Sequence, residues 1–317
     1  MLPPGIFAWE SGHGHEVAPT SLESLARAHP TWDADIRAFG PWTGGVEVGG
    51  LGRFAVARGS GLEGVRGTMP KPEQVIVVVE ECGTTMETAR LLAEAGVLGA
   101  WDAVVAVRQR GGRGQLRRPW ISSPGNLHVS MVMPAPPLDG PWREASADLL
   151  PLIAGYVFVE ALEPLGFRIE IKWPNDLLRN GRKVGGMLIE ERNGLVVLGL
   201  GLNVVESPAD GLMREDHSVS AGILGIAAPW GGPLALCEVL VNRGRNVYAT
   251  LFDELEPARF LSAVTSRLAW HGRRVHVTEE GQDSYQAEIT GLSPKGGLVL
   301  RRAGREVVLY SGSIIPL

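Results

Sequence analysis

A continuous apolar segment at Gln74–Glu80, with the sequence QVIVVVE, constrains the fold more than any other feature of the chain. A strand that is apolar at successive positions is expected to be buried on both faces, as in sheets covered by helices. Thr84 and Glu87 follow it in a Thr-x-x-Glu pattern that predicts a helix start, and Gly96 predicts the helix end. The chain is therefore predicted to contain a mixed sheet with flanking helices.

Further strands and helices are predicted beyond this centre. Two Asn-Gly pairs, Asn180-Gly181 and Asn193-Gly194, predict hairpin turns that join three strands. Two later helices each open with a proline, which suits a first helical turn. The predicted strands outside the hairpins are 103–107, 127–133 and 169–173, and the predicted helices are 144–165, 233–255 and 257–270. Residues 74–270 are thus expected to form one α+β domain.

The last part of the chain, residues 271–317, has a different sequence pattern. It consists of short alternating segments with Gly or Ser between them. Such a pattern predicts a small antiparallel β-barrel. The predicted strands are 274–278, 285–289, 298–302 and 307–310.

The first part, residues 1–73, is rich in Gly, Pro and Trp. It predicts a helix at 21–28, capped by Thr20 and stopped by Pro30, and a second short helix at 32–39. A weak hairpin is expected farther on, at 46–57. Acidic residues outnumber basic ones in this N-terminal extension, so DNA binding is not expected and its role is left open.

Composition places the chain among ordinary soluble proteins. Its 317 residues, 44% hydrophobic and 21% charged, are enough for about two domains. The net charge of −5 gives no reason to expect a polyanionic partner. Cys82 and Cys237 are too few for a disulfide framework or a zinc site. We find no secretory signal pattern and no apolar run near the roughly 20 residues of a membrane span, so a cytoplasmic protein is expected.

The segment Arg110–Trp120 carries four arginines and three glycines in eleven residues. Glycine lets backbone N–H groups approach an anion closely, and guanidinium groups bind phosphate or carboxylate through paired hydrogen bonds. Trp120 offers a flat face to a base or ring. The segment matches neither of the familiar phosphate-loop patterns. A solvated basic loop, or a loop that touches nucleic acid, is therefore an equally open alternative.

Two more segments carry polar residues or glycines at the ends of predicted strands, where they could bind a ligand. Lys172–Asp176 (KWPND) ends a predicted strand, and the Asn-Gly hairpin that follows is expected to bring Lys183 back beside Asp176. The alternative is that Asn175 and Asp176 serve only as turn residues and that Lys183 only keeps an edge strand soluble. In Gly199–Asn203 (GLGLN), glycines alternate within a strand, which indicates either a ligand that approaches closely or tight packing.

Taken together, these motifs resemble the hallmarks of the biotin–protein ligase family in order and in spacing. The matching segments are Gly112-Arg113-Gly114 through Arg118-Pro119-Trp120, Ser123-Pro124-Gly125-Asn126-Leu127, Lys172–Asp176, Lys183–Leu188 and Gly199–Val204. The resemblance covers about residues 74–317 and includes the small C-terminal barrel, which is SH3-like in bacterial members. Five ordered motifs are far more specific than any single glycine pattern.

The resemblance implies an enzyme that joins biotin to AMP from ATP and then transfers biotin to a lysine of a biotin carboxyl carrier protein. Lys183, Arg113, Arg118 and Asp176 match catalytic positions, and Asp176 also matches a position near Mg²⁺. The positions that match biotin- or nucleotide-binding residues are Thr84, Thr85, Gln109, Gly112, Gly114, Gln115, Trp120, Lys172, Asn175, Gly185, Gly199, Gly201 and Asn203. A homodimer through an exposed sheet edge fits the same picture.

Three positions depart from the family pattern. Met86 stands where the family usually has Asn, Gln115 stands where a basic residue usually follows Gly-Arg-Gly, and Arg117 stands where the family usually has a later Gly. Because that basic position helps to retain the acyl adenylate in the family, the resemblance implies weaker retention in this chain. Two alternatives stay open: a lipoate- or octanoate–protein ligase on the same scaffold, and a non-catalytic biotin or nucleotide sensor.

Overall fold

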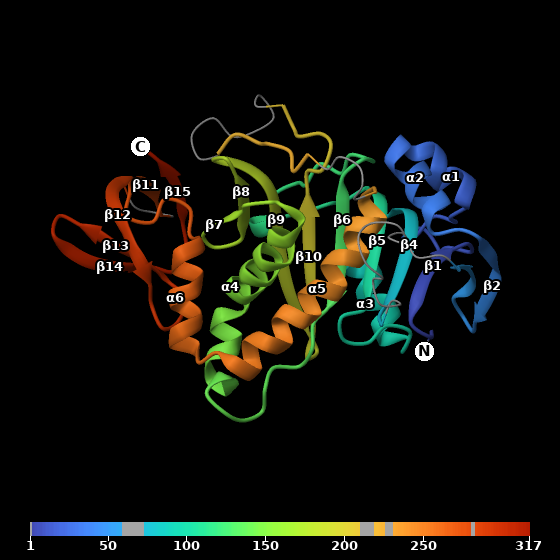
Figure 1. The fold of residues 1–317 in the computed structure, drawn as a ribbon, viewed down its shortest axis with the longest axis horizontal. Helices are drawn as coiled ribbons and strands as arrows, with labels where there is room; N and C mark the ends of the chain where they lie inside the picture. Colours follow the sequence, from blue (N-terminus) through green and yellow to red (C-terminus); the bar gives the residue numbers. More distant parts are fainter. Residues whose placement is uncertain (1, 59–72, 210–218, 226–230, 280–282) are drawn as a thin grey trace. The chain divides into compact units, whose positions relative to one another are not determined.

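The computed structural model describes residues 2–58, 73–209, 219–225, 231–279 and 283–317 (Figure 1). The side chain of Arg117 is likewise outside the described part. The chain divides into two compact units. The first contains residues 1–135, 186–206 and 223–245, and the second contains residues 136–185, 207–222 and 246–317.

A mixed sheet forms the centre of the first unit. Its strand order is β2-β3-β1-β4-β5-β6-β10, with β9 next to β10. The strands β1, β4 and β5 run parallel, whereas β6 is antiparallel to β5, and β10 is antiparallel to β6. The bounds are β1 (Gly5–Trp9), β2 (Trp42–Val48), β3 (Gly52–Ala57), β4 (Val75–Cys82), β5 (Ala103–Gln109), β6 (Leu127–Val132), β9 (Arg182–Arg192) and β10 (Leu195–Leu202). The predicted mixed sheet is confirmed.

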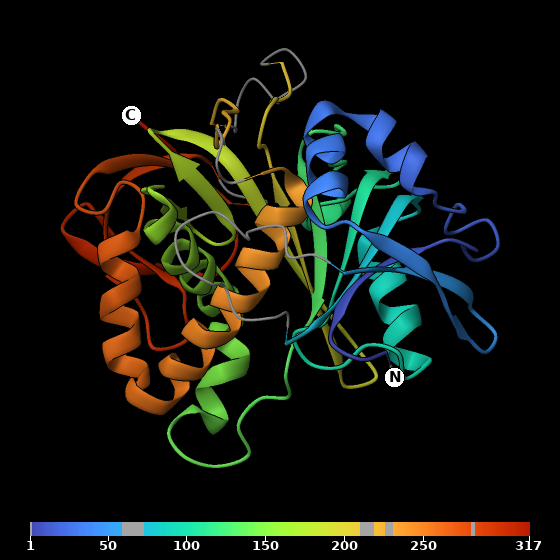
Figure 2. The ribbon, with the colours of Figure 1, turned by 45° about the vertical axis from the view of Figure 1, so that its right-hand side comes forward.

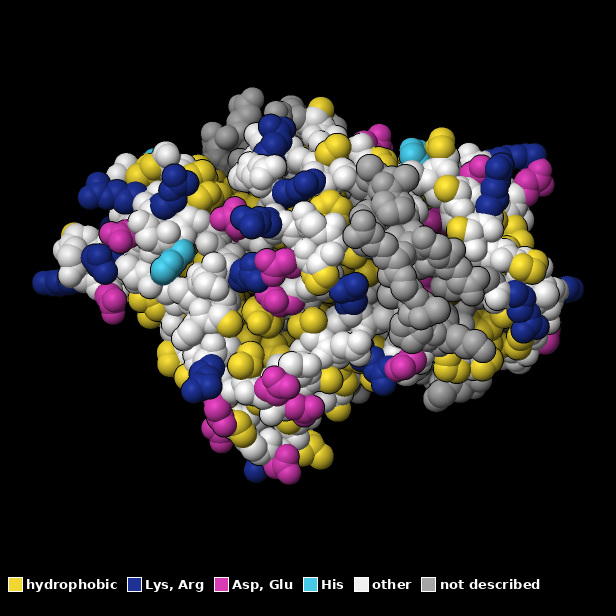
Figure 3. All heavy atoms as spheres, viewed as in Figure 1, with side chains coloured by type: hydrophobic (Ala, Val, Ile, Leu, Met, Phe, Trp, Pro, Cys, Tyr) yellow, Lys and Arg dark blue, Asp and Glu magenta, His cyan; other side chains and the backbone are white. Residues whose placement is uncertain are grey.

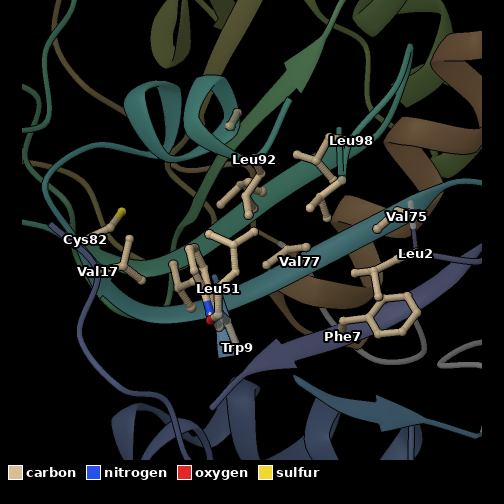
Figure 4. Packing of buried hydrophobic residues seen from close by; sticks show 14 of the residues in the cluster. Leu2, Phe7, Trp9, Val17, Leu51, Val75, Val77, Cys82, Leu92 and Leu98 are labelled. Atoms are coloured by element: carbon tan, nitrogen blue, oxygen red, sulfur yellow. The ribbon is translucent and has the colours of Figure 1, made fainter. Parts of the chain in front are cut away.

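The apolar segment Gln74–Glu80 forms most of β4, and its apolar residues are buried as predicted. Val77 and its neighbours pack between β1 and the helix α3 (Thr85–Glu94), whose Leu92 points into the same cluster (Figure 4). Thr84 caps α3 by accepting a hydrogen bond from the backbone N–H of Glu87 at 3.1 Å, as the sequence predicted. The Thr84 side chain therefore fixes the first turn of α3, which begins directly after β4.

The extension folds as part of the first unit and differs from its prediction in three details. The capping box of α1 (Leu22–Ala28) is formed by Ser21 and Ser24 rather than by Thr20. Pro30 begins the second helix, α2 (Pro30–Ala38), because its ring fits the first helical turn. The strand β1 was not predicted, since five residues after a Pro-Pro pair show too little periodicity. The β2–β3 hairpin confirms the predicted one.

The second unit contains β7 (Glu170–Lys172), β8 (Asp176–Arg179) and the start of β9, with the helices α4 (Trp142–Leu162) and α6 (Pro257–Arg267). The long helix α5 (Pro233–Glu254) belongs to the first unit up to residue 245. Asn180 and Gly181 have φ values of 52° and 73°, so the first predicted Asn-Gly turn is confirmed, and Asn193 and Gly194 repeat it in the first unit with 53° and 76°. The described residues also contain two short 3₁₀ turns, η1 (Gln115–Arg117) in the first unit and η2 (Glu163–Leu165) in the second.

The C-terminal residues of the second unit form an antiparallel sheet in the order β14-β13-β12-β11-β15. The strands are β11 (Arg274–Thr278), β12 (Tyr285–Leu292), β13 (Leu298–Arg302), β14 (Arg305–Leu309) and β15 (Ser313–Pro316). Four of these five strands were predicted, and β15 was missed. The expected fold class, a mixed sheet with helices followed by a small antiparallel β-structure, is confirmed.

The helix α4 is long and strongly apolar. By length and composition, Trp142–Leu165 would suffice to cross a membrane, which the sequence analysis did not anticipate. However, 61% of its most apolar window is buried inside the fold, and Pro151 lies within the helix. Core helices of folded domains share these properties, so α4 is explained as the central helix of the second unit.

Two carboxyl groups are buried where α2 meets the start of α5. Asp35 accepts hydrogen bonds from the backbone N–H groups of Gly232 (2.7 Å) and Leu234 (2.8 Å). Glu238, one turn later, is 1% exposed, and its carboxylate oxygens have no hydrogen-bond partner among the described residues. Burial raises the pKa of Asp35 to about 6, and burial together with the charge of Asp35 raises the pKa of Glu238 to about 7.

We expect Glu238→Gln to remove part of the loss of stability that accompanies a rise in pH from 5 to 8. Because the pKa of Glu238 in the fold lies above its ordinary value of 4.5, protonation stabilises the fold, and this stabilisation is lost as the pH rises through 7. In urea titrations, the free energy of unfolding of the variant minus that of the wild type should increase by about 2 to 3 kcal/mol between pH 5 and pH 8. Glu254→Gln, at an exposed position of α5, is the control, and a difference that does not vary with pH would contradict the expectation.

Candidate functional site

The predicted site residues fall into two groups, one in each unit. In the first unit, the register of β6 and β10 organises the group, because Ser130 lies opposite Gly199 and His128 lies opposite Gly201. Residues directly opposite each other in an antiparallel pair share one face of the sheet. Two buried polar side chains therefore face two glycines on the same surface.

The glycines make room for side chains that cover this surface. A Cβ atom added to Gly199 would lie 3.1 Å from the Sδ atom of Met86, and one added to Gly201 would lie 2.5 Å from the indole of Trp120. The sequence left open whether these glycines admit a ligand or permit tight packing. Within the described residues they permit the packing of Met86 and Trp120.

A hydrogen-bond network connects the start of α3 with β5 and β6. The Oε1 atom of Gln109 accepts hydrogen bonds from the backbone N–H of Thr85 at 2.9 Å and from its hydroxyl at 3.2 Å. The same hydroxyl lies 2.7 Å from the Oγ atom of Ser130, and Gln109 Nε2 donates to Ser122 at 3.2 Å. Since a hydroxyl has one proton, donation by Thr85 to Gln109 leaves Ser130 as donor to Thr85. The structure thus brings together the two predicted residues Thr85 and Gln109.

The glycine- and arginine-rich loop closes on itself. The backbone N–H of Trp120 donates to the carbonyl of Gly112 at 2.8 Å, and the N–H of Gly114 donates to the carbonyl of Arg118 at 2.8 Å. A Cβ atom on Gly112 would lie 2.7 Å from the Trp120 carbonyl, so this position requires glycine, whereas Gly114 faces open space. Gln115 and Arg118 lie exposed at the tip. The loop is therefore a small hairpin that presents its tip to solvent.

A histidine that the sequence analysis did not single out fixes Trp120. The Nδ1 atom of His128 accepts a hydrogen bond from the Trp120 indole N–H at 3.3 Å, and its Nε2 atom lies 3.1 Å from the carbonyl of Ser123. Burial lowers the pKa of His128 to about 4, so the ring is neutral at physiological pH. A neutral ring has one donor and one acceptor, which these two partners use completely.

Arg113 belongs to an ionic cluster on the same unit. Its guanidinium lies 2.8 Å from Glu87 and 3.9 Å from Glu190, and Arg192 lies 3.0 Å from Glu87. The buried Arg90 completes the cluster, at 3.7 Å from Glu190. Three guanidinium groups thus face two carboxylates, and one positive charge is left over. A bound carboxylate or phosphate would be attracted by this excess charge and would compete with Glu87 for Arg113.

The second unit contains the other predicted group. Asp176 lies 2.9 Å from the Nζ atom of Lys172 and 2.6 Å from the Nζ atom of Lys183, as the hairpin argument predicted. Burial raises the pKa of Asp176, but the charges of Lys183 and Lys172 outweigh burial and keep this pKa below its ordinary value. Lys183 is only 26% exposed, which contradicts the alternative that it merely keeps an edge strand soluble.

The remaining predicted residues occupy backbone positions around these groups. Asn175 lies in the turn between β7 and β8, after a cis peptide bond between Trp173 and Pro174. Gly185 is buried in β9 of the second unit. Asn203 is 3% exposed at the end of β10, and its carbonyl accepts a hydrogen bond from the N–H of Leu224 at 2.6 Å.

Several residues of the site were missed by the sequence analysis. Glu87 was interpreted only as part of a helix start, yet it pairs with Arg113. His128 and Ser130 had a usable signal, because they are the polar residues at alternate positions of an otherwise apolar strand (LHVSMV). Glu190 and Arg192 had no such signal, since their partners other than each other are about 80 to 100 residues away in the sequence.

Comparisons with known proteins agree with this picture. The family model described as the biotin/lipoate A/B protein ligase family matches residues 94–203, and the model described as the biotin protein ligase C-terminal domain matches residues 271–315. The biotin–[acetyl-CoA-carboxylase] ligase of Mycobacterium tuberculosis is 30% identical over 251 residues, which cover 76% of this chain and 88% of that protein.

Two further relatives cover different shares of their own length. The bifunctional ligase/repressor BirA of Escherichia coli is 33% identical over 180 residues, which cover 53% of this chain but only 49% of that protein. A solved structure of a biotin protein ligase from Aquifex aeolicus in complex with biotin and ATP is similar with a TM-score of 0.58 and 26% identity, covering 76% of this chain and 97% of that one.

We expect Asp176→Asn to lower the free energy of unfolding at pH 7 by about 3 kcal/mol, because two partly buried ammonium groups would lose their counter-ion. A carboxylate with a lowered pKa stabilises the fold above its ordinary pKa, and this contribution is lost as the pH falls through the lowered value. The difference should therefore shrink in strong acid. Urea denaturation at pH 7 and in strong acid measures this difference in the free energy of unfolding. Asp148→Asn, at an exposed position of α4, is the control. Equal unfolding midpoints for the two variants would show that the lysines do not depend on Asp176.

Proposed function

We propose that this chain, which belongs to the biotin–protein ligase family, is an ATP-dependent ligase that forms biotinyl-5′-AMP and transfers biotin to a lysine of a biotin carboxyl carrier protein. The single structural observation that carries the proposal is the pair of ammonium groups held on Asp176, at 2.9 and 2.6 Å. Such a pair concentrates positive charge on a site that is largely shielded from water. That is what a reaction between two anions requires.

The charge requirement follows from the chemistry of adenylation. A carboxylate oxygen of the acid attacks the α-phosphorus of ATP, a new P–O bond forms, and pyrophosphate leaves with the electrons of the broken bond. Both reactants are negatively charged, so cations must offset the charge that builds up on phosphorus. In the second step an uncharged lysine amine attacks the acyl carbon, AMP leaves, and the amine loses a proton.

We assign this cationic role in the second unit to Lys183, supported by Lys172. Asp176 fixes the directions of both ammonium groups, and Asn175 lies in the turn immediately before it. In the first unit, Arg113 and Arg118 would bind the acid and phosphates. Arg113 carries this charge within a cluster that has one positive charge in excess.

The hydrogen-bond network of the first unit would bind the ureido ring of biotin. The Thr85–Gln109–Ser130 hydrogen bonds place a carboxamide and two hydroxyls together at the start of α3, which is capped by Thr84. These groups pair readily with a polar ureido ring and offer little to a bare aliphatic chain. In the first unit, the residues that would border the nucleotide are Gly112, Gly114, Gln115, Trp120, Gly199, Gly201 and Asn203. Gly185 is the corresponding family position in the second unit.

Magnesium enters the proposal as the ion that accompanies ATP. The residues around Asp176 do not fit a protein-held metal site, since both of its oxygens are paired with ammonium groups. Among the described residues, no cluster of three His, Cys, Asp or Glu side chains could hold a metal ion. Mg²⁺ commonly binds through substrate phosphates and few protein ligands, so we derive no step from a resident metal.

The remaining parts of the proposal concern partners and organisation. We propose residues 74–270 as the catalytic domain, 271–317 as an SH3-like C-terminal domain, and residues 1–73 as an extension without DNA-binding function. On the face drawn in Figure 3, basic and acidic side chains are interspersed, which does not favour a nucleic-acid surface there. A cytoplasmic location fits the reaction, because ATP and carrier proteins are found there. The homodimer stays a prediction.

We expect Lys183→Ala to reduce ATP–pyrophosphate exchange with biotin by about a hundredfold or more, because a cation at the reacting phosphate would be missing. The assay follows labelled pyrophosphate into ATP with biotin, lipoate or octanoate as the acid, and circular dichroism confirms that the variant is folded. Lys295→Ala, at an exposed position of the second unit, is the control.

The same assay separates the alternatives. Exchange with biotin alone supports the proposal, and exchange with lipoate or octanoate alone would assign the chain to that class. Binding of biotin without any exchange would make it a sensor. Near wild-type exchange in Lys183→Ala would overturn the assignment of Lys183.

We expect Gln115→Arg to slow the release of free acyl adenylate by about threefold, since one exposed ion pair contributes up to about 1 kcal/mol. Gln115 lies exposed at the tip of the loop, where a guanidinium can reach an anionic intermediate. Chromatography of the free adenylate after a single turnover measures the release. Gln115→Met, similar in length and uncharged, should behave like the wild type, and equal release from all three proteins would count against the idea.

A further inference from the structure

The N-terminal extension contacts the loop that carries the Ser123-Pro124-Gly125-Asn126 motif. Trp32 on α2 is fully buried, and its indole N–H donates to the carbonyl of Pro124 at 2.7 Å. In Figures 1 and 2, α1 and α2 lie at the end of the sheet where β4 finishes, which is also where the Thr84 cap begins. A segment outside the region of family resemblance therefore forms a direct hydrogen bond to a family motif.

The position of Trp32 is set from two sides of α2. His29 caps the helix, with its Nδ1 atom accepting from the N–H of Thr31 at 3.2 Å. Asp35 lies three residues after Trp32, and hence on the same side of the helix, and binds the start of α5. Because both neighbours are anchored, α2 cannot move the indole away from Pro124 without breaking these contacts.

The loop itself is clamped at Gly125. A Cβ atom at this position would lie 2.9 Å from Cε1 and 3.0 Å from Nε2 of the His29 imidazole, and it would also collide with Val205. The chain at Gly125 therefore passes between α2 on one side and the segment after β10 on the other. Any displacement of α2 would change the space available to both.

Asn126 connects the loop to the backbone that follows β10 through hydrogen bonds. Its Oδ1 atom accepts hydrogen bonds from the N–H groups of Val204 (2.8 Å), Val205 (3.1 Å) and Glu206 (3.3 Å). Its Nδ2 atom donates to the carbonyl of Glu206 at 2.9 Å. One buried side chain thus fixes the backbone that follows Asn203 directly.

The same loop also determines where Trp120 lies. The His128 ring connects the Ser123 carbonyl, one residue before Pro124, to the Trp120 indole. Trp120 in turn covers Gly201. The Ser123–Asn126 loop is therefore the common support of Trp120 and of residues 203–206, and Trp32 holds it from the extension.

We propose that Trp32 is a positioning residue for nucleotide binding, which acts through the Ser123–Asn126 loop on Trp120 and on the backbone after Asn203. The proposal rests on the proposed function, since it takes these residues as the border of the nucleotide site. Under this proposal, the N-terminal extension supports the residues of the ligase site and does not bind DNA.

Trp32→Phe tests the proposal, because it keeps an aromatic ring in the buried position and removes the hydrogen bond to Pro124. Trp42→Phe is a matched control: the Trp42 indole N–H donates to the carbonyl of Ile36 at 2.8 Å, entirely within the extension. We expect Trp32→Phe to raise the KM for ATP about fivefold and to leave the KM for biotin and kcat within about twofold, as for the loss of one hydrogen bond. Trp42→Phe should leave all three constants unchanged, although both variants lose the same donor.

Calorimetric titration of each protein with ATP alone provides the second measurement. A fivefold weaker Kd for Trp32→Phe, with a melting temperature close to that of Trp42→Phe, supports the proposal. Equal ATP binding in the wild type and Trp32→Phe would overturn it, and so would equal losses in both variants, which would indicate general destabilisation. If the wild type binds ATP but exchanges no pyrophosphate, the proposed function fails while the titration still decides the role of Trp32.

Discussion

The register between β6 and β10 is the constraint on which the first unit's site depends. It places Ser130 and His128, both buried, opposite Gly199 and Gly201. A buried polar group without a partner costs about 1 to 3 kcal/mol, so each of these side chains requires a partner close by. Ser130 forms a hydrogen bond with Thr85, and His128 forms hydrogen bonds with the Trp120 indole and the Ser123 carbonyl. A shift of one residue would turn these groups to the other face and break the network.

Much of the fold and part of the site follow from local rules. The apolar run of β4, the Thr84 cap and the two Asn-Gly turns each depend on residues that are neighbours in the sequence. The same holds for the contact between Asp176 and Lys183, since a tight hairpin leaves little freedom in how its two strands pair. Where a short turn joins two segments, the sequence predicted side-chain proximity as well as secondary structure.

The features that could not be predicted depend on contacts between distant segments. The strand β1 has too few residues to show a period, and it forms because β3 and β4 offer it partners on both sides. Pro30 was interpreted as a stop, although its geometry fits the first turn of α2 equally well, and only the packing of Trp32 and Asp35 decides. The pairing of Arg113 with Glu87 and Glu190 likewise arises only when α3 and β9 are folded next to each other.

The place of β1 in the strand order has a consequence for solubility. Residues Gly5–Ala8 pair along Val75–Val78, so the continuous apolar run of β4 lies inside the sheet instead of at its edge. An uncovered edge strand of this composition would be a ready template for pairing with another polypeptide chain. With the extension in place the edge is β2, which contains an irregularity between Thr43 and Val46 and the charged residue Glu47. Both features discourage intermolecular strand pairing at this edge.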